Sequence, residues 1–228
     1  MPAHRRAALQ RCAALALLAL AAPWTPARAD SPTAEEDAVR YFLAIQLDDD
    51  RTVRAVLARG LDPNTSDPER GESGLIIAMR YDAMKVAQLL LTQPALRVDQ
   101  AAPNGNTALM MAAFQKNKPA VLALLAKGAQ INRPGWTALH YAAAAGALDI
   151  MQLLLERHAY LDAESPSGMT PLMLAAREGM EDAVQLLLQA GADASLKDRA
   201  WGMDAAGFAT RADKPWIAQA IQRHLGKK

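Results

Sequence analysis

Apolar residues recur along this chain as pairs of short runs, with polar residues between the two runs of each pair. The first run of a pair is rich in Ala and the second is rich in Leu. The clearest pairs are 109–113 with 121–125, 139–143 with 150–155, and 172–176 with 184–188. Each pair predicts two helices that pack against each other, and the recurrence predicts that these helix pairs stack.

The residues around the first run of each pair also repeat. Gly105-Asn106-Thr107-Ala108-Leu109-Met110-Met111-Ala112-Ala113 returns as Gly135-Trp136-Thr137-Ala138-Leu139-His140-Tyr141-Ala142-Ala143 and as Gly168-Met169-Thr170-Pro171-Leu172-Met173-Leu174-Ala175-Ala176. The three threonines lie 30 and 33 residues apart. A Gly-Ala step follows two of the second runs, at 128–129 and 191–192.

This pattern resembles the ankyrin repeat, in which G-x-T-P-L-H-x-A-A precedes a Leu-rich helix and a Gly-Ala step. The resemblance implies an all-α solenoid of helix-turn-helix units with short β-hairpin fingers between them. It covers nearly all of the chain after residue 29 as a single domain, 30–228. The expected units are 36–64, 71–101, 104–132, 135–163 and 168–197, with a C-terminal cap at 202–225.

The residue types fit this expectation physically. The threonine at the start of an inner helix can accept a backbone N–H as an N-cap. Alanine keeps the inner helix narrow, and glycine can adopt the left-handed conformation that ends the outer helix. One unit cannot bury its own apolar face, so neighbouring units should share one core. Leu154 is expected in that core.

Three departures from the repeat stand out. His158 replaces the glycine that ends the outer helix, which predicts a different helix end there. Only His140 keeps the histidine of the family motif, for which the resemblance implies a structural hydrogen bond between units. Four residues separate Asn132 from Thr137, whereas seven separate Asp162 from Thr170, so the finger before Thr137 should be short.

The N-terminus has the pattern of a secretory signal peptide. A basic head with Arg5, Arg6 and Arg11 precedes the apolar run 13–22, and Ala27-Arg28-Ala29 follows as a cleavage site. The run has 10 residues, whereas a membrane span needs about 20. We expect cleavage of residues 1–29 and export to the periplasm; secretion outside the cell is the alternative. No membrane insertion is expected after cleavage.

Charge and cysteine content narrow the classes of partner. Cleavage would remove four Arg and no acid, leaving 21 basic and 24 acidic residues, a net charge near −3. That balance gives no reason to expect nucleic acid as a partner. Cys12 is the only cysteine and lies in the signal, so the exported chain would have no disulfide or catalytic thiol.

No motif predicts catalysis, a cofactor or a metal. His140, His158 and His224 lie in different units without the paired spacing of metal ligands. Ser73 lacks the glycine that a nucleophile elbow needs two residues later, and it aligns with the helix-capping threonines. The acids at 48–50 are expected to cap a helix. We therefore expect a protein that is not an enzyme.

The resemblance implies that the partner is a protein, held by finger tips and by exposed positions of the inner helices. The expected contact residues are Arg80, Tyr81, Phe114, Gln115, Trp136, Ala144, Ala145, Met169, Arg177 and Glu178, with Glu72 and Met203 among further finger positions. Tyr, Trp and Arg often dominate interface energies. Phe114 and Trp136 could equally pack between units.

The short finger and the small side chains of Ala144 and Ala145 predict a hollow with Trp136 at its rim, with both alanines facing solvent. A scaffold or adaptor is the expected role. An inhibitor or immunity protein that blocks a toxin or hydrolase in the same compartment is the alternative, and the sequence does not separate the two.

Overall fold

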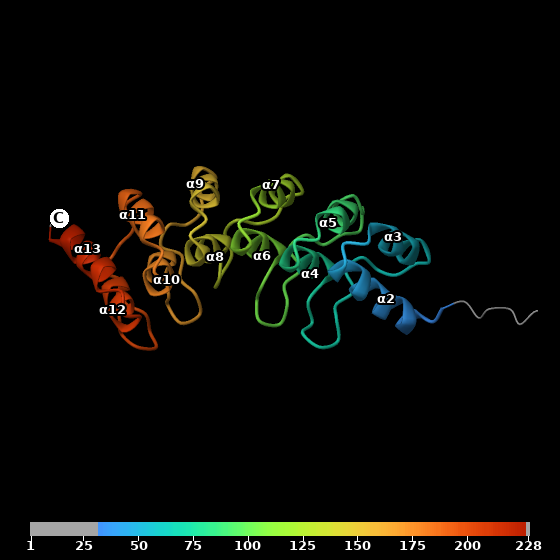
Figure 1. The fold of residues 1–228 in the computed structure, drawn as a ribbon, viewed down its shortest axis with the longest axis horizontal. Coiled ribbons are helices and arrows are strands. Elements are labelled where there is room, and N and C mark those ends of the chain that lie inside the picture. Colours follow the sequence, from blue (N-terminus) through green and yellow to red (C-terminus); the bar gives the residue numbers. More distant parts are fainter. Residues whose placement is uncertain (1–31, 227–228) are drawn as a thin grey trace, which may run out of the picture. The chain divides into compact units, whose positions relative to one another are not determined.

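The computed structural model describes residues 32–226, and the helical unit begins at Ala34. The described residues form twelve helices, arranged as six pairs of an inner and an outer helix (Figure 1). The inner helices are α2 (Ala34–Gln46), α4 (Gly74–Arg80), α6 (Ala108–Phe114), α8 (Ala138–Ala145), α10 (Pro171–Glu178) and α12 (Ala205–Arg211). The outer helices are α3 (Asp50–Ala58), α5 (Met84–Leu91), α7 (Lys118–Ala126), α9 (Leu148–Glu156), α11 (Glu181–Gln189) and α13 (Pro215–Leu225). We number these pairs as units one to six.

Neighbouring units pack through helices of the same kind. Each inner helix contacts the next inner helix, and each outer helix contacts the next outer helix. Within a unit the inner and outer helices also pack together. This confirms the all-α solenoid.

The turn from inner to outer helix is built the same way in every unit. One residue in each turn has a positive φ: Asp48, Asp82, Lys116, Gly146, Gly179 and Asp213. The residue after it donates its N–H to a carbonyl of the inner helix, and in all six turns the acceptor is an alanine. These six hydrogen bonds, 2.8–3.1 Å long, end the inner helices in the same way, and the chain then turns back into the outer helix.

The core runs without interruption through the stack. Alanines fill the contacts between inner helices, for example Ala112, Ala142 and Ala175, all fully buried. Leu90 and Leu154 are fully buried at the same position of their outer helices, which confirms the expected place of Leu154. Capping follows the sequence as well, because Ser73 and Thr170 each accept a backbone N–H at the start of an inner helix.

The fingers are tighter than the expected β-hairpins. Four of them close with two backbone hydrogen bonds, as where Ser165 donates its N–H to the Met169 carbonyl and accepts the N–H of Gly168. Within residues 32–226 the only strand-like pairing is an isolated antiparallel bridge between Ser66 and Ser73. The finger before α8 reaches less far than its neighbours (Figure 1), as its shorter sequence predicted.

His158 corrects one expectation. It adopts a φ of +64° after α9, where the equivalent glycines Gly128 and Gly191 have φ values of +95° and +97°. Helix α9 therefore ends as its neighbours do, with histidine in the left-handed region in place of glycine. The signal-peptide prediction for residues 1–29 lies outside the described residues. Among those that are described, no helix has the length and hydrophobicity to cross a membrane.

Candidate functional site

The exposed ends of the inner helices line up along one surface, which we call the inner face. Counting from the first residue of each inner helix, position seven is occupied by Arg80, Phe114, Ala144, Arg177 and Arg211 in units two to six. Position eight is occupied by Tyr81, Gln115, Ala145, Glu178 and Ala212. Because the helices stack in register, these side chains, together with those of the fingers, decide where the inner face is filled and where it is hollow.

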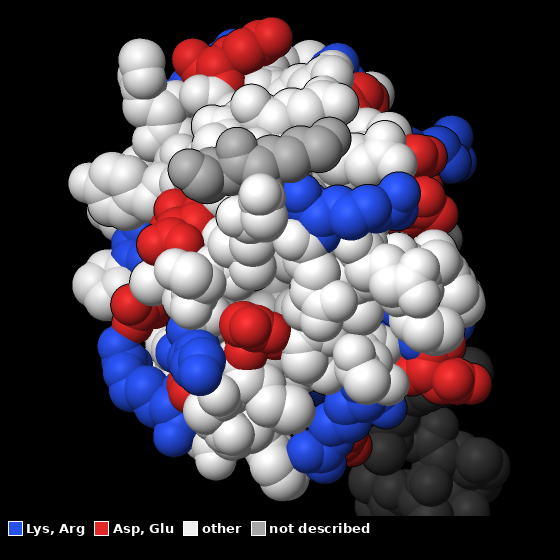
Figure 2. Space-filling model, turned by 90° about the vertical axis from the view of Figure 1, so that its left-hand side faces the viewer, with Lys and Arg blue, Asp and Glu red and all other residues white. Residues whose placement is uncertain are grey.

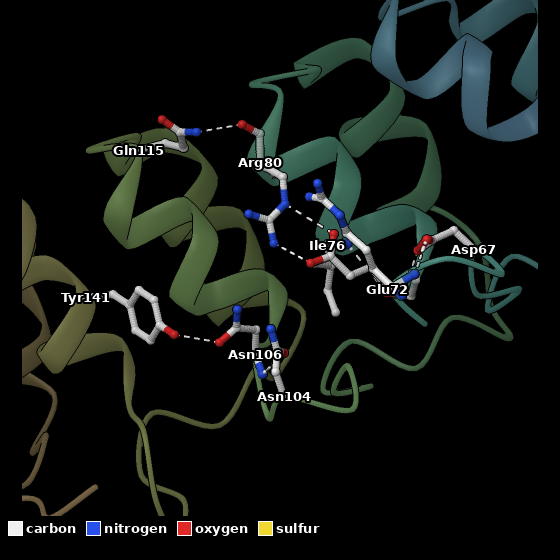
Figure 3. A network of polar contacts seen from close by, with 10 residues as sticks. Asp67, Glu72, Ile76, Arg80, Asn104, Asn106, Gln115 and Tyr141 are labelled. Atoms are coloured by element: carbon white, nitrogen blue, oxygen red, sulfur yellow. Dashed lines mark hydrogen bonds and ion pairs between the residues drawn. The ribbon is translucent and has the colours of Figure 1, made fainter.

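Unit two fills its part of the inner face with an ion pair. The Arg80 guanidinium reaches back to its own finger, where Nε donates to the Glu72 carboxylate at 3.1 Å and a terminal nitrogen makes a second, shorter contact (Figure 3). Glu72 is buried, with 4% of its side chain exposed. The Gln115 amide then donates to the Arg80 carbonyl and ties unit three to unit two. The expectation that Glu72 is an exposed finger tip is therefore wrong.

An aromatic cluster lies between units three and four. The rings of Phe114 and Trp136 each meet Tyr141 edge to face, with centroids 6.2 Å and 6.3 Å apart. The Tyr141 hydroxyl donates to Asn106 of the neighbouring finger, and burial raises the pKa of Tyr141. Phe114 remains 49% exposed, whereas Trp136 is partly buried. Both residues pack between units and still present ring surface to a partner.

Unit four leaves a hollow of about 660 Å³ at the inner face. Its floor includes Ala144 and Ala145, and Phe114, Tyr141 and Trp136 are among the surrounding walls. The hollow is the one that the short finger and the small side chains predicted. One detail differs, because Ala144 is partly exposed whereas Ala145 is only 8% exposed. The side chain of Ala145 packs against the stack and does not face solvent freely.

His140 holds units four and five together. One ring nitrogen contacts the N–H and hydroxyl of Thr137 at 3.2 Å and 2.9 Å, and the other lies 2.9 Å from the Met169 carbonyl in the next finger. The residue is fully buried, and this burial lowers its pKa to about 4. A neutral histidine with both nitrogens occupied is a structural link, as the resemblance implied.

A second hollow of about 500 Å³ lies beside the first, toward unit six. The two share Trp136 and Arg177 as walls and therefore adjoin each other, and we call the pair of hollows the groove. Trp201 borders the second hollow with 62% of its surface exposed. The Arg211 guanidinium stacks on the Trp201 ring at 3.9 Å from its centroid. The sequence interpretation missed Trp201 and Arg211, although an arginine at position seven was a signal that it could have used.

The remaining predicted contact residues separate into exposed and buried ones. Tyr81 is half exposed beside a smaller hollow of about 280 Å³ between α2 and α4, where Val39 and Leu43 are also exposed. Arg177 and Glu178 form an ion pair with each other, and both are about half exposed. Met169 is buried, which corrects its expected place at an exposed finger tip, although it still borders the second hollow.

Comparison with known proteins agrees with this architecture. A family model described as ankyrin repeats in three copies matches residues 41–134 and 131–198. The chain belongs to the ankyrin-repeat family. Its relatives include SH3 and multiple ankyrin repeat domains protein 2 of Homo sapiens, 33% identical over 150 residues, and protein glp-1 of Caenorhabditis elegans, 34% identical over 172 residues. The matches span 64% and 68% of this chain but only 8% and 13% of those relatives.

A mouse relative, protein fem-1 homolog A-like, is 40% identical over 89 residues, which are 38% of this chain and 14% of that protein. Ankyrin repeats form a protein-interaction fold that is generally without catalytic activity, and the likeness to these proteins is a likeness of repeats.

Charge on the described part of the ankyrin stack is mixed. Figure 2 shows lysines, arginines and acids interspersed with uncharged surface on the face at the α12–α13 end. Within residues 32–226 no three His, Cys, Asp or Glu side chains come together in a group that could hold a metal ion. At the other end, the expected capping by acids is confirmed, since Asp49 accepts the N–H groups of Arg51 and Thr52 at the start of α3.

Proposed function

We propose that this ankyrin-repeat chain is a non-catalytic binding module that is exported to the periplasm and acts there as a scaffold or adaptor. The groove over units three to six is its binding site for a protein partner. The observation that carries the proposal is the pairing of two adjoining hollows with exposed aromatic rings at both ends, Phe114 and Trp201. Concave surfaces with aromatic anchors are favoured interaction sites.

Site-specific photo-crosslinking in the native host tests the location of the binding site. A benzoylphenylalanine in place of Ala144 lies in the groove, whereas the same residue in place of Gln152, exposed on outer helix α9, serves as the control. We expect a discrete cross-linked protein from position 144 and none from position 152. A cross-link from position 152 alone would place the contact surface on the outer helices.

Export is tested independently of binding. The signal pattern predicts that the mature protein begins at Asp30 and is released with the periplasmic fraction. N-terminal sequencing of the protein from its host checks this, and a chain that keeps Met1 in the membrane fraction would contradict it. If the cross-linked partner is a toxin or hydrolase whose activity this protein abolishes, the role is that of an inhibitor instead of a scaffold.

A further inference from the structure

The three arginines at position seven of the inner helices have different partners, and the difference indicates what the groove binds. In unit two, Arg80 is paired with a carboxylate eight residues earlier in its own finger, Glu72. The residues eight positions before Arg177 and Arg211 are methionines, Met169 and Met203. Units five and six thus keep the cation of this pair and have lost its acid.

The structure shows that the geometry of the pair persists in unit five. A terminal nitrogen of Arg177 lies 3.9 Å from the Met169 sulfur, across the same eight-residue separation that joins Arg80 to Glu72. A thioether is only a weak hydrogen-bond acceptor, so this nitrogen lacks a strong partner. The opposite edge of the Arg177 guanidinium binds Glu178, with Nε 2.9 Å from the carboxylate.

Arg211 is the more available of the two cations. Within residues 32–226 its guanidinium makes no ion pair or hydrogen bond, and its central carbon lies over the exposed ring of Trp201, 3.9 Å from the centroid. Stacking on an aromatic ring leaves the N–H groups at the edge of the guanidinium free to bind a carboxylate in its plane. Both arginines border the same 500 Å³ hollow.

Among the residues that line this hollow, the only charged one besides the two arginines is Asp198. The Asp198 carboxylate is buried and accepts the backbone N–H groups of Ala200, Trp201 and Met203, each at 2.9 Å. Glu178 lines the first hollow and is paired with Arg177. The hollow therefore offers the cationic donors of Arg177 and Arg211 beside one buried carboxylate that is already hydrogen-bonded to the backbone, together with the apolar surface of Trp136, Trp201 and Phe208.

From this arrangement we infer that the hollow between units five and six receives an acidic side chain of the partner, next to an apolar one. The partner's carboxylate binds Arg211 and Arg177, and its apolar neighbour packs between the two tryptophans. The inference rests on the proposed binding function and adds the chemistry of the partner segment to it. Glu72 on Arg80 shows how this fold seats a carboxylate at the equivalent place (Figure 3).

A phage-displayed library of random twelve-residue peptides supplies the probe. Peptides selected on the purified protein are resynthesised in two forms, one as selected and one with each Asp or Glu replaced by Asn or Gln. We expect selected peptides to carry an acid beside an apolar residue. Loss of that acid should weaken binding about tenfold or more in calorimetry, because hydrogen bonds to charged groups are the strong ones.

Restoring the missing acid within the protein gives the sharper test. Met169→Glu places a carboxylate where Glu72 stands in unit two, so that the terminal nitrogen of Arg177 that now faces the Met169 sulfur is bound by its own chain. We expect this variant to bind the acidic peptide about tenfold more weakly. Met169→Gln should weaken binding less, because it changes the shape without adding charge. Gln152→Glu adds the same charge on outer helix α9 and should leave binding unchanged.

The indole N–H signals of Trp136, Trp201 and Trp216 locate the peptide by NMR. The first two border the groove, whereas Trp216 lies on α13 and faces solvent elsewhere. Peptides that shift Trp136 and Trp201 but bind equally with or without their acid would overturn the inference and leave the proposed groove intact. Equal binding by Met169→Glu and Met169→Gln would also overturn it. Failure to select any peptide that shifts these two signals would count against both the inference and the groove.

Discussion

In unit two an ion pair between buried Glu72 and partly exposed Arg80 occupies the inner face, whereas in unit four the same positions leave a larger hollow. The two units share the same packing of inner and outer helices, which we call the frame, and Leu90 and Leu154 are equally buried in their outer helices. They differ at position seven of the inner helix, which is Arg80 in unit two and Ala144 in unit four. They also differ in the finger, where unit two has Glu72 and unit four has Trp136 at the equivalent position. The repeat thus conserves the contacts that stack one unit on the next, and only the outermost positions decide whether a unit fills its surface or exposes a site.

The shared frame is tested by truncating both leucines. Leu90→Ala and Leu154→Ala should each lower the free energy of unfolding by about 2–5 kcal/mol, since each leaves a cavity in a closely packed core. Chemical denaturation monitored by circular dichroism measures the loss. Exposed Gln152→Ala in α9 is the control and should change stability by less than about 0.5 kcal/mol. A large loss for one leucine but none for the other would show that the two units do not share a frame.

Units two and four also differ at position three of the inner helix, which is Ile76 in unit two and His140 in unit four. The pH dependence of unfolding tests the consequence of this difference. Burial lowers the folded-state pKa of His140 from 6.5 to about 4, so the unfolded chain binds a proton first as pH falls. The contribution of neutral His140 to the free energy of unfolding is fully present above pH 6.5. It is lost progressively as the pH falls toward 4, and the total loss is about 3 kcal/mol.

His140→Met is the matched variant, because Met110 and Met173 occupy this position in units three and five. In unit five the Met173 sulfur accepts the N–H of Thr170 at 3.4 Å, which shows that the frame tolerates methionine here. Unfolding of this variant should depend much less on pH between 6.5 and 4. A stability profile as steep as that of the unmodified protein would assign the pH dependence to another group.

The ion pair of unit two is tested from both sides. Arg80→Met should lower stability by about 2 kcal/mol, since it leaves the buried Glu72 carboxylate without its cation. Glu72→Gln should have a smaller effect, because the Arg80 side chain is 30% exposed and can turn toward water. Thermal unfolding of the two single variants and the double variant gives the coupling energy of the pair. A coupling near zero would mean that the pair fills the surface without stabilising it.

The sequence predicted the frame well because the units repeat one another, and residues that recur at the same position of several units mark the positions that pack. The stacked helix pairs, the capping residues, buried Leu154 and the role of His140 all followed from comparing repeats. The detail of the inner face followed less well. Burial of Glu72 depends on an arginine eight residues away that folds back over the finger. The Trp201–Arg211 stack joins a finger to a helix of the atypical last unit, where the repeat pattern is weakest.

Ala145 illustrates the same limit on a smaller scale. Positions seven and eight of the inner helix both read as surface in the repeat, yet Ala144 is partly exposed whereas Ala145 is 8% exposed. The difference depends on how the next unit packs against α8, and the sequence of unit four alone does not contain that information. An arginine at Ala145 would have to displace part of the stack, so position 144 is the better place to fill the hollow.

Ala144→Arg converts unit four toward unit two and is expected to have the smallest effect on stability. Arginine already stands at position seven in units two, five and six, so the frame accepts it, and the change in unfolding free energy should stay below about 1 kcal/mol. The long side chain should nevertheless occupy much of the 660 Å³ hollow. Binding of the partner identified by cross-linking should be lost while the circular dichroism spectrum is unchanged.

Gln152→Arg on α9 adds the same side chain away from the groove and should bind normally. If Ala144→Arg folds and binds as tightly as the unmodified protein, the hollow of unit four is not part of the contact surface, and the binding site is confined to the hollow between units five and six or lies outside the groove.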